Sequence, residues 1–150
     1  MHHVIIGGGP AATNAIETIR EFDRGQSAIT LVCDEPAHSR MALPYSLAGS
    51  IPEAHTHTGD PAYFTRLKVT TRFGVRVAAV DPQRKAVTLT DGGKLEFDNL
   101  LIATGSSPLR PAIPGADLPG VTPLWSLAHT GHVLKHAESR SRKKSCADSP

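Results

Sequence analysis

The chain has 150 residues, of which 39% are hydrophobic, and its 16 Lys and Arg against 14 Asp and Glu give a formal net charge of +2. A charge this close to balance does not indicate a nucleic-acid partner, and no apolar stretch reaches the ~20 residues of a membrane-spanning helix. Because there are two cysteines and no signal-peptide pattern, we expect a cytoplasmic protein with one hydrophobic core.

A strand, a glycine turn and a helix are predicted at the start of the chain. The apolar run at residues 4–6 leads into the pattern Gly7-x-Gly9-x-x-Ala12, and residues 11–22 form a helical stretch. Gly7 permits a tight turn, Gly9 lets a phosphate approach the backbone, and Ala12 lets helix and strand pack closely. The free N–H groups and the dipole of the helix favour an anion at this end. The pattern therefore predicts a dinucleotide phosphate site.

Two acidic residues follow the second predicted strand, residues 28–33. They are Asp34 and Glu35. In a βαβ unit, a carboxylate at this place accepts hydrogen bonds from the adenosine ribose hydroxyls. We predict that Asp34 or Glu35 has this role, which suits FAD or NAD rather than NADP.

A series of short strands follows, where a simple NAD-binding unit would continue with a crossover helix. Residues 75–80 and 86–90 are predicted strands, and the turn at residues 91–93 leads into a third strand at 94–97. The apolar run at residues 100–103 is typical of a parallel strand buried on both faces. This meander disfavours half of an NAD-dependent dehydrogenase, which stays an alternative.

With Ala103-Thr104-Gly105 added, residues 1 to about 128 resemble the amino-terminal part of a pyridine nucleotide-disulfide oxidoreductase-type flavoprotein. The chain is similar to the branch that contains coenzyme A-disulfide reductase, NADH oxidase, rubredoxin reductase and the nitrite reductase flavoprotein. The expected fold is α/β: a Rossmann-like FAD-binding βαβ unit with a parallel sheet and an antiparallel β-meander, incomplete at its C-terminal end.

The resemblance implies that FAD occupies the glycine turn. The residues it assigns to FAD are Gly7, Gly9, Pro10, Ala11 and Ala12 at the pyrophosphate, Asp34 or Glu35 at the ribose, Arg40 near the phosphates and flavin, Val77 at the adenine, and Ala103, Thr104 and Gly105 close to the cofactor. The guanidinium of Arg40 suits phosphate oxygens because it offers a fork of N–H donors.

One departure from the family concerns sulfur. Met41 stands where the disulfide-reductase and NADH oxidase members carry a redox cysteine, and a thioether forms no thiolate. Cys33 lies in a predicted buried strand and Cys146 in the tail, so we expect both to be inert. We therefore expect electron transfer from NAD(P)H through FAD to a protein or another redox centre.

No catalytic residue and no metal site are predicted in this chain. The candidate histidines are His55 and His57, and His129, His132 and His136, and neither group is accompanied by an acidic or cysteine ligand.

The last residues do not continue the family pattern. Residues 1–128 are predicted to be the N-terminal portion of an FAD-binding domain, and residues 129–150 a truncated helix followed by a basic irregular tail. A second glycine fingerprint for NAD(P)H is missing, so we expect a truncated product in which NAD(P)H belongs only to a full-length parent or to a partner chain that supplies the missing domain. A non-catalytic fragment that binds an adenine dinucleotide is the further alternative.

Overall fold

The computed structural model describes the fold of residues 1–147 and the side chains of residues 1–137. The chain divides into two units. The first comprises Met1–Ser39 and His57–Gly105, and the second comprises Arg40–Thr56 and Ser106–Pro150. Residues 1–128, predicted to be one portion of a domain, are thus shared between both units.

A four-stranded parallel sheet is the centre of the first unit. It is built from β1 (His2–Ile6), β2 (Ala28–Cys33), β3 (Val69–Phe73) and β7 (Asn99–Ile102) in the order β3-β2-β1-β7. The sequence predicted β1, β2 and β7 and missed β3, which lies at the edge of the sheet. Parallel pairing brings the carboxyl ends of β1, β2 and β7 to the same edge.

A second sheet confirms the predicted meander. Strands β4 (Val77–Asp81), β5 (Ala86–Leu89) and β6 (Lys94–Glu96) pair in an antiparallel manner in that order. The register between β4 and β5 shifts between Val77 and Ala79, which is a β-bulge.

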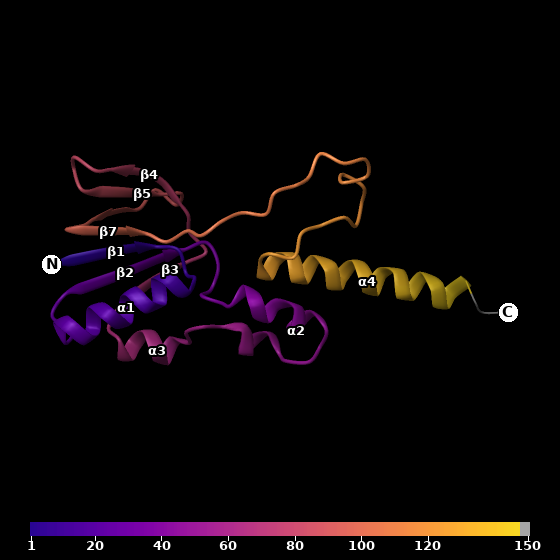
Figure 1. Cartoon of the computed structure of the whole chain (residues 1–150), viewed down its shortest axis with the longest axis horizontal. Coiled ribbons are helices and arrows are strands. Elements are labelled where there is room, and N and C mark those ends of the chain that lie inside the picture. The colour runs from indigo at the N-terminus through magenta and orange to yellow at the C-terminus, as the bar shows by residue number, and fades with distance from the viewer. Residues whose placement is uncertain (148–150) are drawn as a thin grey trace. The chain divides into compact units, whose positions relative to one another are not determined.

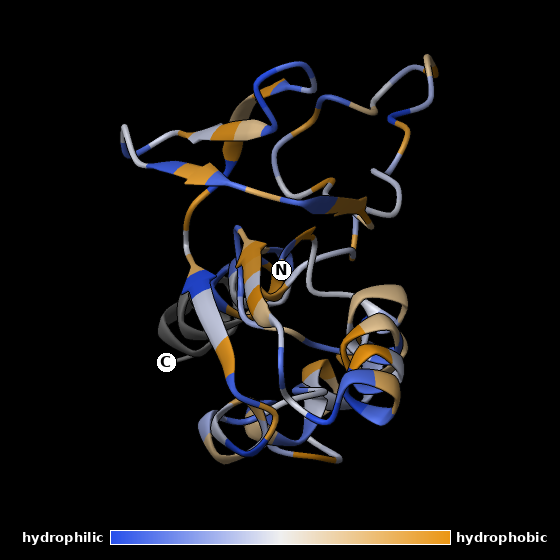
Figure 2. Ribbon diagram, turned by 90° about the vertical axis from the view of Figure 1, so that its left-hand side faces the viewer, coloured by the Kyte–Doolittle hydropathy of each residue, from blue (hydrophilic) through white to orange (hydrophobic). Residues whose placement is uncertain are grey.

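The first unit has three layers, with the parallel sheet between the meander and the helices α1 (Pro10–Asp23) and α3 (Pro61–Arg66) (Figure 1). On one face of the parallel sheet, Ile5 packs with Ile16 of α1 and Phe64 of α3. On the other face, Val4 packs with Val87 of β5. The strands beside the N-terminus are accordingly coloured largely as hydrophobic in Figure 2. The α/β prediction, a Rossmann-like parallel sheet with an antiparallel meander, is confirmed.

The residues at its two ends define where helix α1 begins and ends. Gly9 is the N-cap, Pro10 is the first helical residue, and Arg24 at the C-cap has a positive φ of 52°. Proline suits this first position because its missing N–H would have no partner inside the helix. Ala12 and Ile16, one turn apart, are fully buried and hold the helix on the sheet.

A polar corner ties the end of α1 to the connection between α3 and β3. The guanidinium of Arg20 donates to the backbone oxygens of Leu67, at 2.6 Å, and of Lys68, at 3.0 Å. It also donates to a carboxylate oxygen of Asp23, at 2.9 Å. These bonds fix the α1 terminus against the chain that enters β3.

Asp23 makes this corner sensitive to acid. Its carboxylate accepts hydrogen bonds from the hydroxyl of Ser27 and from the backbone N–H groups of Gly25, at 2.7 Å, and Ser27, at 3.0 Å. The Ser27 hydroxyl bond is the largest of the causes that hold the pKa of Asp23 well below its usual range. A lowered native pKa stabilises the fold at neutral pH, and this contribution is lost as the pH falls.

We expect Asp23→Asn to weaken the acid dependence of stability. Below about pH 4 the unfolded carboxyl takes up a proton that the native one resists, so the native chain loses stability there. The measurement is the urea midpoint of unfolding at pH 7 and pH 3 for the native chain and the variant. Ser27→Ala, which keeps the carboxylate and removes its main donor, should give an intermediate result. An unchanged difference between the two pH values in Asp23→Asn would contradict this role.

The second unit is mainly helical. It contains the short helices η1 (Arg40–Ala42), α2 (Leu43–Leu47) and η2 (Glu53–Thr56) and the long helix α4 (Leu127–Ala147). The predicted irregular tail is wrong as far as Ala147, because α4 continues through the basic residues, whose intrinsic helix propensity is high. Residues 148–150 of that predicted tail lie outside the described residues. Within the part of the chain that is described, no helix has the length and apolar character to span a membrane.

Candidate functional site

The turn between β1 and α1 is built around Gly7. Its N–H donates to the backbone oxygen of Val32 at the end of β2, at 2.8 Å, and the N–H of Ala103 donates to Ile6 at the same distance. The φ of Gly7 is +108°, and a Cβ at this position would lie 2.2 Å from the backbone oxygen of Ala103. Glycine is therefore required here by the close approach of the residue that follows β7.

Gly9 has the opposite surroundings. A Cβ added to it would meet no atom within 4 Å, so the backbone faces open space. Gly9 is also the N-cap of α1, and no side chain caps this end of the helix. An uncapped helix N-terminus that opens onto free space presents backbone N–H groups and a positive dipole, which suit a phosphate.

Asp34 directly follows β2, the strand that pairs with β1. Its Oδ2 atom accepts a hydrogen bond of 2.6 Å from Nη2 of Arg76, and its Oδ1 atom lies 3.9 Å from the thiol of Cys33. Glu35 has different surroundings, because its Oε1 atom lies 3.6 Å from Nε2 of the buried His38. The two acids that the sequence left as alternatives thus face different partners.

The two segments predicted to lie along the rest of the cofactor belong to the same unit. Val77 opens β4, and its half-buried side chain packs on the cluster that includes Val4 and Val87. Thr104 and Gly105 follow β7, and the N–H nitrogen of Thr104 would lie 3.0 Å from a Cβ on Gly7. The first unit therefore contains the predicted residues of the glycine turn, both acids, Val77 and residues 103–105.

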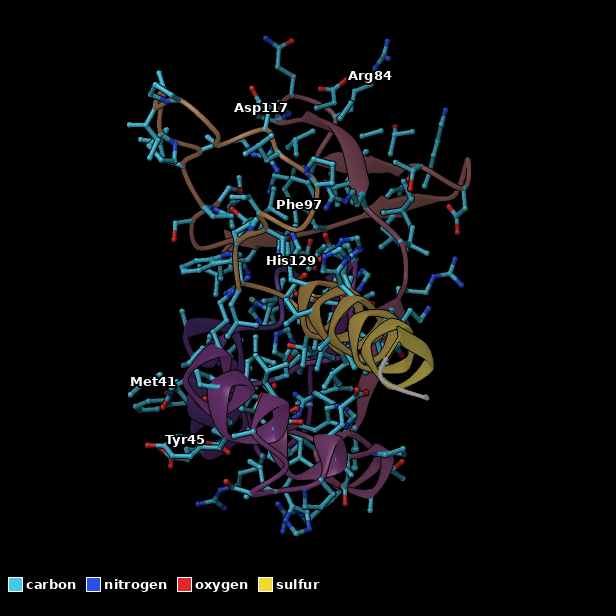
Figure 3. All side chains as sticks on the ribbon, turned by 90° about the vertical axis from the view of Figure 1, so that its right-hand side faces the viewer. Met41, Tyr45, Arg84, Phe97, Asp117 and His129 are labelled. Carbon is cyan, nitrogen blue, oxygen red and sulfur yellow. The ribbon has the colours of Figure 1, made fainter. Side chains whose placement is uncertain are left out.

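Arg40 belongs to the second unit. Its Nε atom donates to the backbone oxygen of Trp125, at 3.2 Å, and its guanidinium carbon lies 4.9 Å from the centre of the Trp125 ring. The indole N–H of Trp125 donates in turn to the backbone oxygen of Ser106, at 3.0 Å. Met41 and Tyr45 project outward on one side of the same segment (Figure 3), with exposed fractions of 84% and 62%.

Cys33 and the histidines are the remaining side chains of the described region for which the sequence raised redox or metal chemistry. Cys33 is buried, and this burial raises the pKa of its thiol, which opposes thiolate formation. Among the residues that the structure describes, no group of three or more His, Cys, Asp or Glu is placed to hold a metal ion.

Sequence reasoning missed Arg76 and Trp125. Arg76 pairs with a carboxylate that lies 42 positions earlier in the chain, and Trp125 contacts an arginine 85 positions earlier. No local pattern marks either contact. The signal in the sequence is that Arg76 immediately precedes Val77, which the family resemblance predicts to lie at the adenine.

Comparison with known proteins identifies the relatives of the chain. The model of the family described as pyridine nucleotide-disulphide oxidoreductase matches residues 1–145. Rhodocoxin reductase from Rhodococcus erythropolis is 36% identical over 124 residues, and the epsilon subunit of NADH-dependent phenylglyoxylate dehydrogenase from Aromatoleum evansii is 34% identical over 117 residues. These matches cover 81% and 77% of this chain, which spans 29% and 28% of the length of those relatives.

A solved structure, that of an NAD-dependent persulfide reductase from A. fulgidus, is 33% identical with a TM-score of 0.80. That similarity covers 93% of this chain and 27% of the other. The family model covers nearly the whole chain, and the strand order and glycine turn of the structure are consistent with it. The chain therefore belongs to the pyridine nucleotide-disulphide oxidoreductase family.

Proposed function

We propose that the first unit binds FAD and is the FAD-binding portion of an NAD(P)H-dependent flavoprotein oxidoreductase. The observation that supports this most strongly is the open space at Gly9, in front of an uncapped helix N-terminus. The space that a Cβ would take at Gly9 is free, which suits the close approach of a phosphate to the backbone. The carboxylate of Asp34, at the end of the neighbouring strand, supplies acceptors for a ribose.

The residues present fit the adenine half of FAD. Gly7, Gly9 and the first residues of α1 (Pro10, Ala11 and Ala12) would hold the pyrophosphate, Asp34 or Glu35 the ribose, and the backbone near Val77 the adenine. Residues 103–105 would pass close to the cofactor. When bound, FAD would supply hydride and electron transfer, while the protein supplies binding, orientation and electrostatics.

The acceptor of the electrons is proposed to be a protein or another redox centre. Met41 is exposed and cannot act as a thiol, and the buried Cys33 resists ionisation. This chain is similar to rhodocoxin reductase and to the ferredoxin--NAD(+) reductase component of a biphenyl dioxygenase system. The names of both relatives describe reductases of a protein, rhodocoxin or ferredoxin. This chain spans less than a third of the length of those two relatives.

The test is the cofactor content of the purified chain. The protein is denatured, and the released small molecule is identified by chromatography and visible absorbance; the stripped chain is then titrated with FAD and with NAD. We expect close to one FAD per chain, or saturable uptake of FAD on titration. Uptake of NAD in place of FAD would favour the dehydrogenase alternative, and a folded chain that takes up neither would contradict the proposal.

A further inference from the structure

The two carboxylate oxygens of Asp34 have different hydrogen-bond partners. Oδ2 is bound by Arg76 at 2.6 Å, which is the short distance of a charge-assisted hydrogen bond. Among the residues that the structure describes, the hydrogen-bond partner of Oδ1 is the Cys33 thiol, at the long distance of 3.9 Å, and the side chain of Asp34 is 42% exposed. The pairing therefore fixes the orientation of the carboxylate and leaves one oxygen to accept a further donor.

Arg76 is itself held at its backbone. Its N–H donates to the hydroxyl of Thr90, at 3.2 Å, and its carbonyl accepts from the Thr90 N–H, at 2.9 Å. The preceding residue, Val75, donates to the backbone oxygen of Cys33, at 3.4 Å. The backbone around Arg76 is therefore hydrogen-bonded both to the meander and to the end of β2. Its guanidinium binds Asp34, the residue that follows β2.

Stability alone does not account for this pair. The side chain of Arg76 is 75% exposed, and exposed ion pairs contribute little to the free energy of unfolding. Arg84 and Asp81 form a comparable exposed pair at the other end of β4, at 3.9 Å, where no cofactor residue is predicted. Arg76 differs from Arg84 because its side chain binds Asp34, a predicted ribose ligand, and because it directly precedes Val77, the residue predicted to lie at the adenine.

We propose that Arg76 is a positioning residue for the adenosine end of FAD, and that it acts by holding Asp34, rather than Glu35, as the carboxylate that receives the ribose hydroxyls. This inference rests on the proposed binding of FAD. Asp34 suits the role better than Glu35, because Arg76 holds its carboxylate at 2.6 Å whereas the Oε1 atom of Glu35 lies 3.6 Å from Nε2 of the buried His38. No contact between Arg76 and the cofactor is required.

The test is a double-mutant cycle on the affinity for FAD, measured by the change in flavin fluorescence on titration of the full chain. We expect Arg76→Met to weaken binding ~5-fold and Asp34→Asn ~10-fold, because each disturbs a hydrogen bond to a charged group. If Arg76 acts through Asp34, the double variant should stay at ~10-fold rather than the ~50-fold of independent effects. Arg76→Lys should recover most of the loss, and Arg84→Met, the matched control, should bind as the native chain does. The thermal midpoints of all variants should be close to the native value.

Each other outcome is decisive. Native affinity in Arg76→Met overturns the inference and leaves the proposed function intact. Independent, multiplicative effects overturn it as well, because Arg76 would then act without Asp34. Failure of the native chain to bind FAD overturns the proposed function, and this inference with it.

Discussion

Replacement of Gly7 by alanine is expected to destabilise the chain by about 3–5 kcal/mol. Two costs combine at this position. The φ of +108° is unfavourable for any residue with a Cβ, and that Cβ would lie 2.2 Å from the backbone oxygen of Ala103. Relief would require β7 to move away from β1. The measurement is urea unfolding followed by circular dichroism.

Gly74→Ala is the matched control. Gly74 also has a positive φ, of +75°, but a Cβ there would meet nothing within 4 Å. It should therefore cost only the backbone strain, about 1 kcal/mol. The difference between the two variants contains the contact with Ala103 together with the added backbone strain of the larger φ at Gly7. Equal destabilisation of both would show that the backbone after β7 does not approach the turn closely.

Gly9→Ala is expected to separate cofactor binding from stability. The φ of Gly9 is −80°, which alanine adopts, and the added methyl group meets no protein atom, so the stability should change by no more than about 1 kcal/mol. The same methyl group would occupy the space in which a pyrophosphate must approach the backbone. We expect the affinity for FAD to fall by about 10- to 100-fold, since close approach is the reason for this glycine.

Fluorescence titration of Gly9→Ala with FAD provides the measurement, and thermal unfolding of the same sample reports stability. Gly131→Ala is the control, because it also adds a methyl group in open space but lies within α4 rather than at the turn. It should leave the affinity for FAD unchanged. Native affinity in Gly9→Ala would mean that the phosphates do not lie against this residue.

The strand, turn and helix at the start of the chain could be predicted because each depends on neighbouring residues. The apolar residues of β1, the glycines and Pro10 indicate a strand, a turn and a helix start by their local pattern, which can be read before any distant contact is known. Strand β3 could not be predicted in this way. Residues 70–72 are polar or charged, and their extended form depends on pairing with β2, whose Thr30 and Leu31 lie opposite Thr70 and Thr71.

The parts of the candidate site that could be predicted are those that belong to short sequence motifs. Gly7, Gly9 and Ala103 were each predicted to lie close to the cofactor, because the glycine turn and the Ala103-Thr104-Gly105 sequence are motifs of the resembled family. The ion pair between Asp34 and Arg76 was not, because two exposed side chains 42 positions apart leave no periodic pattern. The contact of Arg40 with Trp125 escaped prediction for the same reason.

The position of β1 in the middle of its sheet has a consequence for the order of folding. Its pairing with β2 closes a short βαβ unit, and the β4–β5–β6 hairpins are equally local, so both can form early on a nascent chain. Its pairing with β7 is different, because His2 binds Asp98 across a separation of 96 residues. Closing so long a loop costs entropy that no earlier contact has offset. Gly7 can pack on Ala103 only after β7 has left the ribosome, so the turn that would hold a cofactor is among the last parts of its unit to form.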